Sequence, residues 1–222
     1  MTNIVISIGG SLISTEGKAE RDIKEWGHLI EESAKERKIY VVVGGGPVAR
    51  EYIRTARNLG ADETFLDDLG ITITRANARL MIAALPNAYP VPAASLEEAI
   101  WASATYPVVV MGGTHPGHTT DAVAAMLAER SDGRLIIATN VDGVYTTDPA
   151  TDPSATRIEE MTPQQLVDMP RSTEAGASSP VDLVAARIIA RSKIPTFILN
   201  GNDLRALNNA IAGRSFVGTR VI

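Results

Sequence analysis

The sequence of 222 residues contains no cysteine. That absence excludes disulfides, thiolate metal sites and cysteine nucleophiles, and it favours a cytosolic location. No stretch approaches the roughly 18 consecutive apolar residues that a membrane-spanning helix needs. The first residues, MTNIVISIGG, begin a strand pattern without the basic region and apolar core of a signal peptide. We therefore expect a cytoplasmic protein with no membrane partner.

The sequence is also short of positive charge. It has 21 Lys and Arg against 26 Asp and Glu, a formal net charge of −5. Proteins that bind nucleic acids usually carry a basic patch, whereas these basic residues are scattered among acids, so we expect no nucleic-acid partner. A small phosphate ligand is not excluded, because backbone amides and a few arginines can hold it.

Strands and helices are predicted to alternate along the chain. Short β-branched runs predict strands at residues 4–8, 39–43, 108–111, 135–138 and 196–199. Helical spacing predicts helices at residues 23–34, 48–59, 63–85, 95–103, 121–130, 181–192 and 204–212. Residues 145–157 are interpreted as a surface loop. The alternation predicts the α/β class, a three-layer α-β-α sandwich around a central, mainly parallel sheet.

Three predicted strands end in glycines that precede a helix, in the segments ISIGGSL, VVVGGGPVAR and VVMGGTHPGHTTDAVAA. Glycine allows close backbone approach, and a helix start offers free N–H groups to phosphate. Each helix end contributes only about 0.3–1 kcal/mol, so several loops must converge on one polyphosphate. No segment matches the P-loop pattern or the dinucleotide fingerprint, so neither of those protein classes is supported.

The order and wording of six segments resemble the amino-acid kinase superfamily, and within it the archaeal branch of uridylate kinases. The segments are GGS at 9–11, VVVGGGPVAR, FLDDLGITITRANA, GGTHPGHTTDAVAA, TNVDGVYTTDP and DLVAARIIARS. The resemblance implies a single domain over residues 1–222, with an acceptor-binding lobe at roughly 1–130 and an ATP-binding lobe at roughly 131–222. It implies phosphoryl transfer from Mg-ATP to UMP, giving UDP and ADP for CTP and UTP biosynthesis.

The resemblance also implies roles for individual residues. The implied catalytic residues are Gly10, Ser11, Asp121 and Asp182. The implied UMP-binding residues are Gly45, Asp67, Thr114, His115, Pro116, Gly117, His118, Thr119 and Thr120. The implied ATP-binding residues are Gly9, Gly10, Gly46, Arg50, Thr139, Asn140, Tyr145 and Asp148. Asp67 would hydrogen-bond the ribose of UMP. Mg²⁺ would arrive with ATP rather than occupy a protein metal site.

The sequence departs from the superfamily at two lysines. Many members carry a lysine two residues before the first glycine pair, where this chain has Ser7. A second lysine is missing because residues 177–181 read ASSPV. Positive charge for the transferred group would then come from Arg50, Mg²⁺ or Lys18. The family is commonly a hexamer built from dimers and is often inhibited by UTP, so both are expected here.

Several features keep a second interpretation. His115 and His118 are spaced like metal ligands, but without a third ligand nearby we expect them to donate to phosphate or backbone. Asp142-Gly143 could be only a turn. Arg75 could face the acceptor phosphate, form a structural ion pair or make a subunit contact. Two functional alternatives are another small-molecule kinase of the superfamily and a non-catalytic nucleotide-binding or storage module.

Overall fold

The computed structural model describes residues 2–13, 19–149, 151–170 and 180–222. Its centre is a seven-stranded sheet in the order β3-β2-β1-β4-β8-β9-β7. These strands are β1 (Asn3–Ile8), β2 (Ile39–Val43), β3 (Val108–Met111), β4 (Gly133–Thr139), β7 (Glu160–Met161), β8 (Thr196–Asn200) and β9 (Thr219–Val221). Apart from the antiparallel pair β8 and β9, the recorded strand pairings in this sheet are parallel. The predicted mainly parallel sheet is confirmed.

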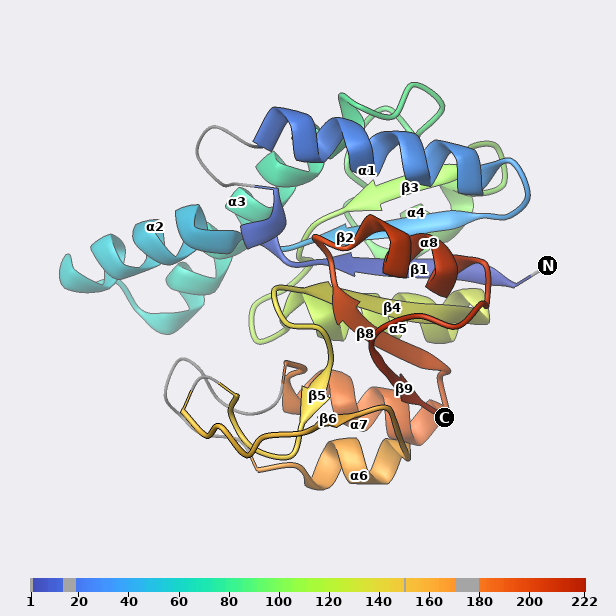
Figure 1. The fold of residues 1–222 in the computed structure, drawn as a ribbon. Helices are drawn as coiled ribbons and strands as arrows, with labels where there is room; N and C mark the ends of the chain where they lie inside the picture. The colour runs from blue at the N-terminus through green and yellow to red at the C-terminus, as the bar shows by residue number, and fades with distance from the viewer. Residues whose placement is uncertain (1, 14–18, 150, 171–179) are drawn as a thin grey trace.

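Helices cover both faces of the sheet (Figure 1). They are η1 (Gly10–Leu12), α1 (Ala19–Ala34), α2 (Gly46–Asn58), α3 (Glu63–Ile82), α4 (Leu96–Ala102), α5 (Thr120–Ser131), α6 (Pro163–Asp168), α7 (Leu183–Ser192) and α8 (Leu204–Ile211). A separate two-stranded antiparallel sheet joins β5 (Val144–Tyr145) to β6 (Arg157–Ile158). The three-layer α/β architecture agrees with the prediction. Among the helices of the described residues, none is long and apolar enough to cross a membrane.

Alternation along the strands gives the molecule two apolar cores. In β1, Ile4, Ile6 and Ile8 pack with α1, α3 and α8 on one face. Val5 packs with α4, α5 and α7 on the other face. Successive strand residues point to opposite faces, so Ser7 must face the α5 side. Fully burying each large aliphatic side chain stabilises the fold by about 1.5–3 kcal/mol, which fixes the register of this central strand.

Two local features differ from what the sequence indicated. The buried face of α3 carries the polar residues Thr74 and Asn77 beside Met81, whereas Ile71 and Ile82 are only partly buried. The predicted surface loop 145–157 is bounded by the small β5–β6 sheet instead of being irregular throughout. Strands of two residues are too short to produce a detectable period.

The strand order places the ligand-binding end. The chain moves outward from β1 through β2 to β3, and then returns to β4 on the other side of β1. In open parallel sheets, ligands bind beyond the carboxyl ends of the strands where the order reverses. In Figure 1 those ends point to the left, where α2 extends beyond the sheet. A ligand is therefore expected between the loops that follow β1, β2, β3 and β4.

Candidate active site

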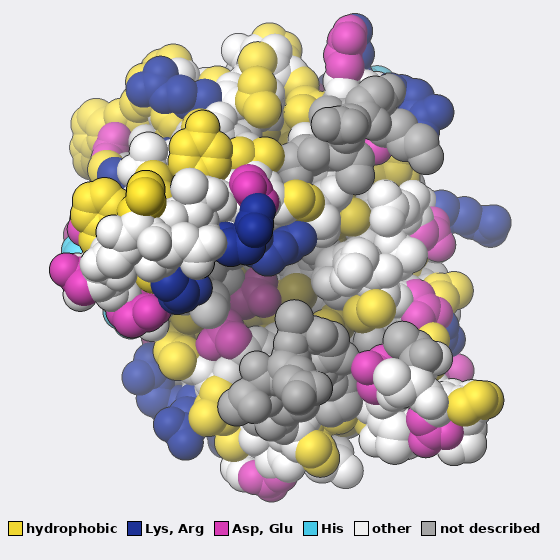
Figure 2. Space-filling model, turned by 90° about the vertical axis from the view of Figure 1, so that its left-hand side faces the viewer, with side chains coloured by type: hydrophobic (Ala, Val, Ile, Leu, Met, Phe, Trp, Pro, Cys, Tyr) yellow, Lys and Arg dark blue, Asp and Glu magenta, His cyan; other side chains and the backbone are white. Residues whose placement is uncertain are grey.

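A cavity of about 430 Å³ lies at the carboxyl ends of the strands, between α2, α3 and the loop that precedes α5. Its lining residues are Gly45, Gly46, Ala49, Arg50, Ile53, Asp67, Gly70, Ile71, Thr74, Gly113, Gly117, His118, Thr119 and Thr120. Figure 2 views the molecule from this end and shows acidic and basic side chains around a central hollow. The cavity brings many of the predicted acceptor-binding residues together.

A larger cavity, about 780 Å³, lies elsewhere, between α1 and the segment that follows α3. Its lining includes Lys24, His28 and Asn87 but none of the glycine loops. Because volume alone does not bind phosphate, we place the candidate site at the smaller cavity, where helix starts and strand-end glycines meet.

The first two glycine loops touch through their backbones. A side chain at Gly10 would lie 2.2 Å from the nitrogen of Gly46, and one at Gly44 would lie 2.8 Å from the nitrogen of Gly10. Only glycine fits such an approach. The loops after β1 and β2 therefore form one continuous backbone surface at the edge of the cavity.

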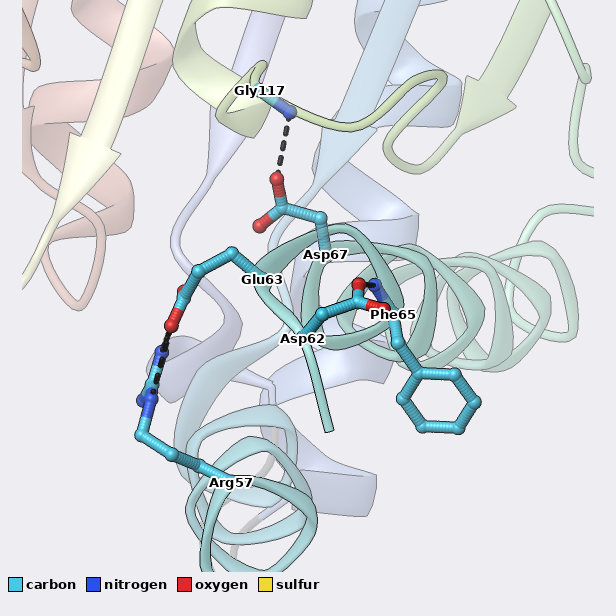
Figure 3. Close-up of polar contacts among 6 residues, drawn as sticks. All are labelled: Arg57, Asp62, Glu63, Phe65, Asp67 and Gly117. Atoms are coloured by element: carbon cyan, nitrogen blue, oxygen red, sulfur yellow. Dashed lines mark hydrogen bonds and ion pairs between the residues drawn. The ribbon is translucent and has the colours of Figure 1, made fainter. Parts of the chain in front are cut away.

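Asp67 reaches from α3 to the loop before α5. Its Oδ2 accepts a hydrogen bond of 2.7 Å from the Gly117 nitrogen (Figure 3). Within the described residues its Oδ1 has no hydrogen bond. The start of α3 is held in turn by Asp62, which accepts from the Phe65 nitrogen, and by the ion pair between Glu63 and Arg57 of α2. A helix anchored at its first turn thus presents one free carboxylate oxygen to the cavity.

A polar cluster joins β1, α5 and α7 beside the cavity. The Ser7 hydroxyl, on a residue only 1% exposed, donates a 2.6 Å hydrogen bond to Asp121 in the first turn of α5. Burial raises the pKa of Asp121 to about 6, with the negative charge of Asp182 adding to the rise and the Ser7 hydrogen bond opposing it. A carboxyl with such a pKa responds strongly to any cation brought near it.

Asp182 caps α7 and also contacts the N-cap residue of α5. Its Oδ1 accepts from the backbone nitrogens of Val184 and Ala185 at the start of α7. Its Oδ2 accepts a short hydrogen bond from the hydroxyl of Thr119, the N-cap residue of α5. The predicted helix at 181–192 accordingly begins at Leu183, with Asp182 as its N-cap. This aspartate ties the acceptor loop (residues 112–119) to the start of α7, which lies on the same face of the sheet as α5.

Of the residues predicted to bind ATP, Gly46 and Arg50 line the cavity, whereas Thr139, Asn140, Tyr145 and Asp148 lie away from its lining, at the end of β4 and in the segment that contains β5. The Tyr145 hydroxyl donates to Asp142 at 2.7 Å, and Arg157 of β6 pairs with the same carboxylate at 2.8 Å. Burial opposes ionisation of Asp142, but the hydrogen bonds from Tyr145 and Arg157 prevail and lower its pKa. Gly143 has a φ of 149°, so the Asp142-Gly143 turn exists and also carries this network.

The cavity side of the site and the side of the predicted ATP-binding residues Thr139 to Asp148 meet at the loop after β1. The Gly9 nitrogen donates to the carbonyl oxygen of Ala138, the residue before Thr139. The Thr139 hydroxyl donates to Asn140 at 3.2 Å. Further along the loop, the carbonyl of Asp148 accepts from the nitrogen of Asp152. Ser11 lies in the η1 turn that follows Gly9. The β1 loop therefore has the β2 loop on one side and the end of β4 on the other.

Some predicted residues are not brought together. Thr114, His115 and Pro116 belong to the acceptor loop but do not line the cavity. His115 and His118 meet through a backbone hydrogen bond of 3.4 Å. No group of three or more potential metal-binding side chains occurs in the part of the chain that the structure describes.

Helix α2 carries three arginines that could supply positive charge to a bound phosphate. Arg54 pairs with Glu51 and Arg57 with Glu63. Among the described residues Arg50 has no such partner, and it lines the cavity. Lys18 and residues 177–179 lie outside the described residues. Arg50 is thus the cation that the described structure offers to a ligand at this site.

Sequence reasoning missed two residues of α3 that hold the loops. Asn77 donates to the carbonyls of Gly44 and Gly45, and Thr74 accepts from the Gly113 nitrogen. Arg75, which could already be singled out from the sequence, donates to the Gly113 carbonyl at 3.2 Å and so joins them in holding this loop. Polar residues at helical spacing beside Ala78 and Met81 were the available signal.

Glycine loops that converge at the switch point of a parallel sheet, with partly buried acids beside them, define a phosphate-binding α/β protein. The model of the amino acid kinase family matches residues 3–200, and the chain belongs to this family. It is 48% identical to the uridylate kinase of Archaeoglobus fulgidus over 95% of this chain and 97% of that one. It is 47% identical to the uridylate kinase of Methanothrix thermoacetophila, over 95% of each chain.

A solved structure agrees with these sequence similarities. The crystal structure of the uridylate kinase from Archaeoglobus fulgidus superposes on this fold with a TM-score of 0.89, covering 100% of both chains at 46% identity. The resemblance stated from the sequence motifs is therefore confirmed at the level of family and fold.

Proposed function

We propose that this protein is a UMP kinase that transfers the γ-phosphoryl group of Mg-ATP to UMP, giving UDP and ADP for pyrimidine nucleotide synthesis. The observation that carries the proposal is the 48% identity to a uridylate kinase across nearly the whole length of both chains. The cavity beside the glycine loops supplies a physical site for the acceptor nucleotide.

On the acceptor side, Asp67 would accept a ribose hydroxyl at its free Oδ1 while its Oδ2 keeps the Gly117 nitrogen. The first turns of α2 and α5 both face the cavity, and their free N–H groups suit the UMP phosphate. Arg50 would add a positive charge there. A carboxylate acceptor would favour an arginine where this chain has Asp67, so this residue supports a nucleotide over the other acceptors of the family.

The transfer itself needs no protein nucleophile. A phosphate oxygen of UMP forms the new bond to the γ-phosphorus, and the bond between that phosphorus and the β,γ-bridging oxygen breaks, leaving ADP. Such transfers depend on in-line positioning and on stabilising the charge of the transferred group. The contact between Gly10 and Gly46 places amide groups of two loops side by side, where the phosphates of both nucleotides would meet.

The donor would lie on the side of Thr139, Asn140, Tyr145 and Asp148, in the lobe from about residue 131 onward. Mg²⁺ would enter with ATP, neutralise phosphate charge and be oriented by Asp121 and Asp182. The desolvated Asp121 fits this role, because a nearby cation offsets the cost of ionising a carboxyl with a raised pKa. Ser7 would hold that carboxyl in place where other superfamily members have lysine.

We also propose a cytoplasmic location, inhibition by UTP and assembly into a hexamer built from dimers. Large apolar side chains are exposed on the helices, among them Leu59 at 83%, Phe65 at 56% and Trp101 at 72%. Covering such side chains is a common result of self-association. Light scattering of the purified protein would test the assembly, and a monomer at micromolar concentration would contradict it.

One assay tests the proposed activity. Purified protein receives Mg-ATP with UMP, CMP, dTMP, acetylglutamate, carbamate or isopentenyl phosphate, and ADP release is followed. We expect the fastest release with UMP. Faster release with another acceptor would instead identify another kinase of the family. Absence of release with all six acceptors, together with retained ATP binding, would identify a non-catalytic nucleotide-binding protein.

A further inference from the structure

Two almost fully buried polar side chains of α3 form hydrogen bonds to the glycine loops that follow β2 and β3. Asn77, 6% exposed, donates from Nδ2 to the Gly44 carbonyl at 2.8 Å and to the Gly45 carbonyl at 3.2 Å. Thr74, 7% exposed, accepts a 2.8 Å hydrogen bond from the Gly113 nitrogen. Buried polar groups require partners, so these bonds determine the direction in which the loop peptides point.

Contacts from α3 also fix the loop after β3, which contains Gly112 and Gly113. Thr74 donates its own proton to the Ile71 carbonyl at 2.6 Å, which leaves its oxygen to accept from Gly113. Arg75 donates to the Gly113 carbonyl. A side chain at Gly112 would lie 2.6 Å from the Thr74 hydroxyl. The loop therefore lies directly on the helix, and both polar groups of Gly113 are bonded to it.

The same helix reaches the acceptor site and, through one further contact, the phosphoryl site. Asp67 precedes Thr74 by seven residues, about two helical turns. Asn77 holds the Gly44–Gly45 backbone, and that loop is in contact with Gly10. A rigid helix thus connects the residue that would bind the ribose to the two loops that would bind phosphate.

We propose that Thr74 and Asn77 are positioning residues that set the orientation of the phosphate-binding loops relative to Asp67. The inference rests on the proposed UMP kinase function and names the residues that organise its site. Without the Thr74 hydroxyl, the Gly113 nitrogen loses its partner, and the acceptor loop that continues to Thr119 is no longer held in its binding position. Without Asn77, the Gly44–Gly45 peptides can rotate away from the contact with Gly10.

The chain offers a matched control on the same helix. Thr72 also carries a β-branched hydroxyl, but it is exposed, and within the described part of the chain its hydroxyl bonds only to the Asp68 carbonyl. Thr74→Val and Thr72→Val therefore make the same chemical change at a residue that bonds to a glycine loop and at one that does not. Thr74→Ser keeps the hydroxyl and should restore what Thr74→Val removes. Asn77→Ser tests the other loop.

The experiment measures kcat and both KM values for the wild type and these four variants, with thermal unfolding to fix the folded fraction. Leaving a buried N–H unpaired should raise the KM for UMP about tenfold in Thr74→Val. The KM of Thr74→Val for ATP should stay within about twofold of the wild-type value. The same limit should hold for kcat and both KM values of Thr72→Val, which alters no loop contact, and of Thr74→Ser, which keeps the hydroxyl. Asn77→Ser should lower kcat about tenfold, because the misplaced loop contacts the phosphoryl site.

Three results would overturn the proposal: Thr74→Val with wild-type kinetics and only a lower Tm, Thr74→Ser as impaired as Thr74→Val, or Asn77→Ser with unchanged kcat. If Thr74→Val does not fold, the kcat of Asn77→Ser alone decides whether the proposal holds. A wild type that does not phosphorylate UMP contradicts the proposed function instead. The positioning role of Thr74 is then tested by calorimetry of UMP binding, in which Thr74→Val but not Thr72→Val should weaken the affinity.

Discussion

The acceptor and donor sides of the proposed active site are built on different supports. On the acceptor side, Asp67 belongs to a helix of 20 residues whose buried Thr74 and Asn77 fix the neighbouring loops. On the donor side, Tyr145 belongs to a strand of two residues and depends on a partly exposed network with Asp142 and Arg157. The acceptor pocket is thus held by long-range packing, whereas the donor residues are held by local contacts.

The difference teaches where selectivity is fixed. A site whose polar groups are locked by buried bonds discriminates between ligands, because it cannot adjust to the wrong one. A hairpin held by a few local bonds tolerates small changes with small losses. Substitutions on either side should therefore act mainly on the KM of one nucleotide, and on turnover where they reach the residues shared by both sides, as Asn77 does through the Gly44–Gly45 loop. Four experiments test this expectation.

The largest effect is expected where the sides meet, at Asp182. The change Asp182→Asn should lower kcat by about 10²–10³-fold, because it removes the charge that, in the proposed function, orients the donor phosphates. Both KM values should change little, since Asn caps a helix as well as Asp does. The matched control is Asp203→Asn, which alters the N-cap of α8 away from the cavity. Wild-type turnover in Asp182→Asn would exclude this residue from the centre.

The next effect is on stability, at Asp121. Its pKa of about 6 lies above the usual 3.8, so the folded state binds more protons than the unfolded state between these values. Stability then falls as pH rises from about 4 to 6 and is level above that range. Asp121→Asn should raise the free energy of unfolding at pH 7.5 by up to about 2–3 kcal/mol while abolishing activity.

This prediction sharpens the comparison, because polar groups on the acceptor side should behave in the opposite way. Asn77→Ser should lower the free energy of unfolding, since it leaves buried carbonyls unpaired. Denaturant titrations of both variants at pH 5 and pH 7.5 provide the measurement. A gain for Asp121→Asn that is as large at pH 5 as at pH 7.5 would contradict the assignment of a raised pKa.

On the acceptor side alone, Asp67→Ala should raise the KM for UMP by about tenfold or more, because the ribose and the Gly117 nitrogen both lose an acceptor. The KM for ATP should change less than that for UMP. Asp68→Ala is the control, because this neighbour is equally exposed and its carboxylate makes no hydrogen bond among the described residues. Equal changes in both KM values would show that the acceptor pocket is misplaced.

Much of the fold could be predicted because the strong local signals agree with the tertiary structure. The run Ile39–Val43 is β-branched or aromatic throughout and ends in glycines, and it forms the buried strand β2. The helix starts were equally predictable at Asp62 and Thr119, whose side chains cap α3 and α5. By contrast, β5, β6 and β7 have two residues each, so no period could reveal them.

The site was less predictable because its contacts join residues far apart in the sequence. Ser7 and Asp121 are separated by 114 positions, and only the parallel sheet brings them together. Thr74 and Asn77 are polar residues within a predicted helix, and nothing local indicated that glycine loops 30 to 40 positions away would satisfy them. Asp67 was assigned by family resemblance, and its contact with Gly117 required the fold.

The smallest effect is expected on the donor side, at Tyr145. Tyr145→Phe removes the hydroxyl that donates to Asp142 but leaves the ion pair with Arg157, so the hairpin keeps one of its two ties. A partly exposed hydrogen bond contributes about 0.5–1 kcal/mol, which corresponds to a rise of about threefold in the KM for ATP. The KM for UMP should not change. Tyr52→Phe, on the exposed side of α2, is the control. If Tyr145→Phe alters the KM for UMP as much as that for ATP, the two sides do not act separately, and the hairpin must be held in place by the acceptor lobe.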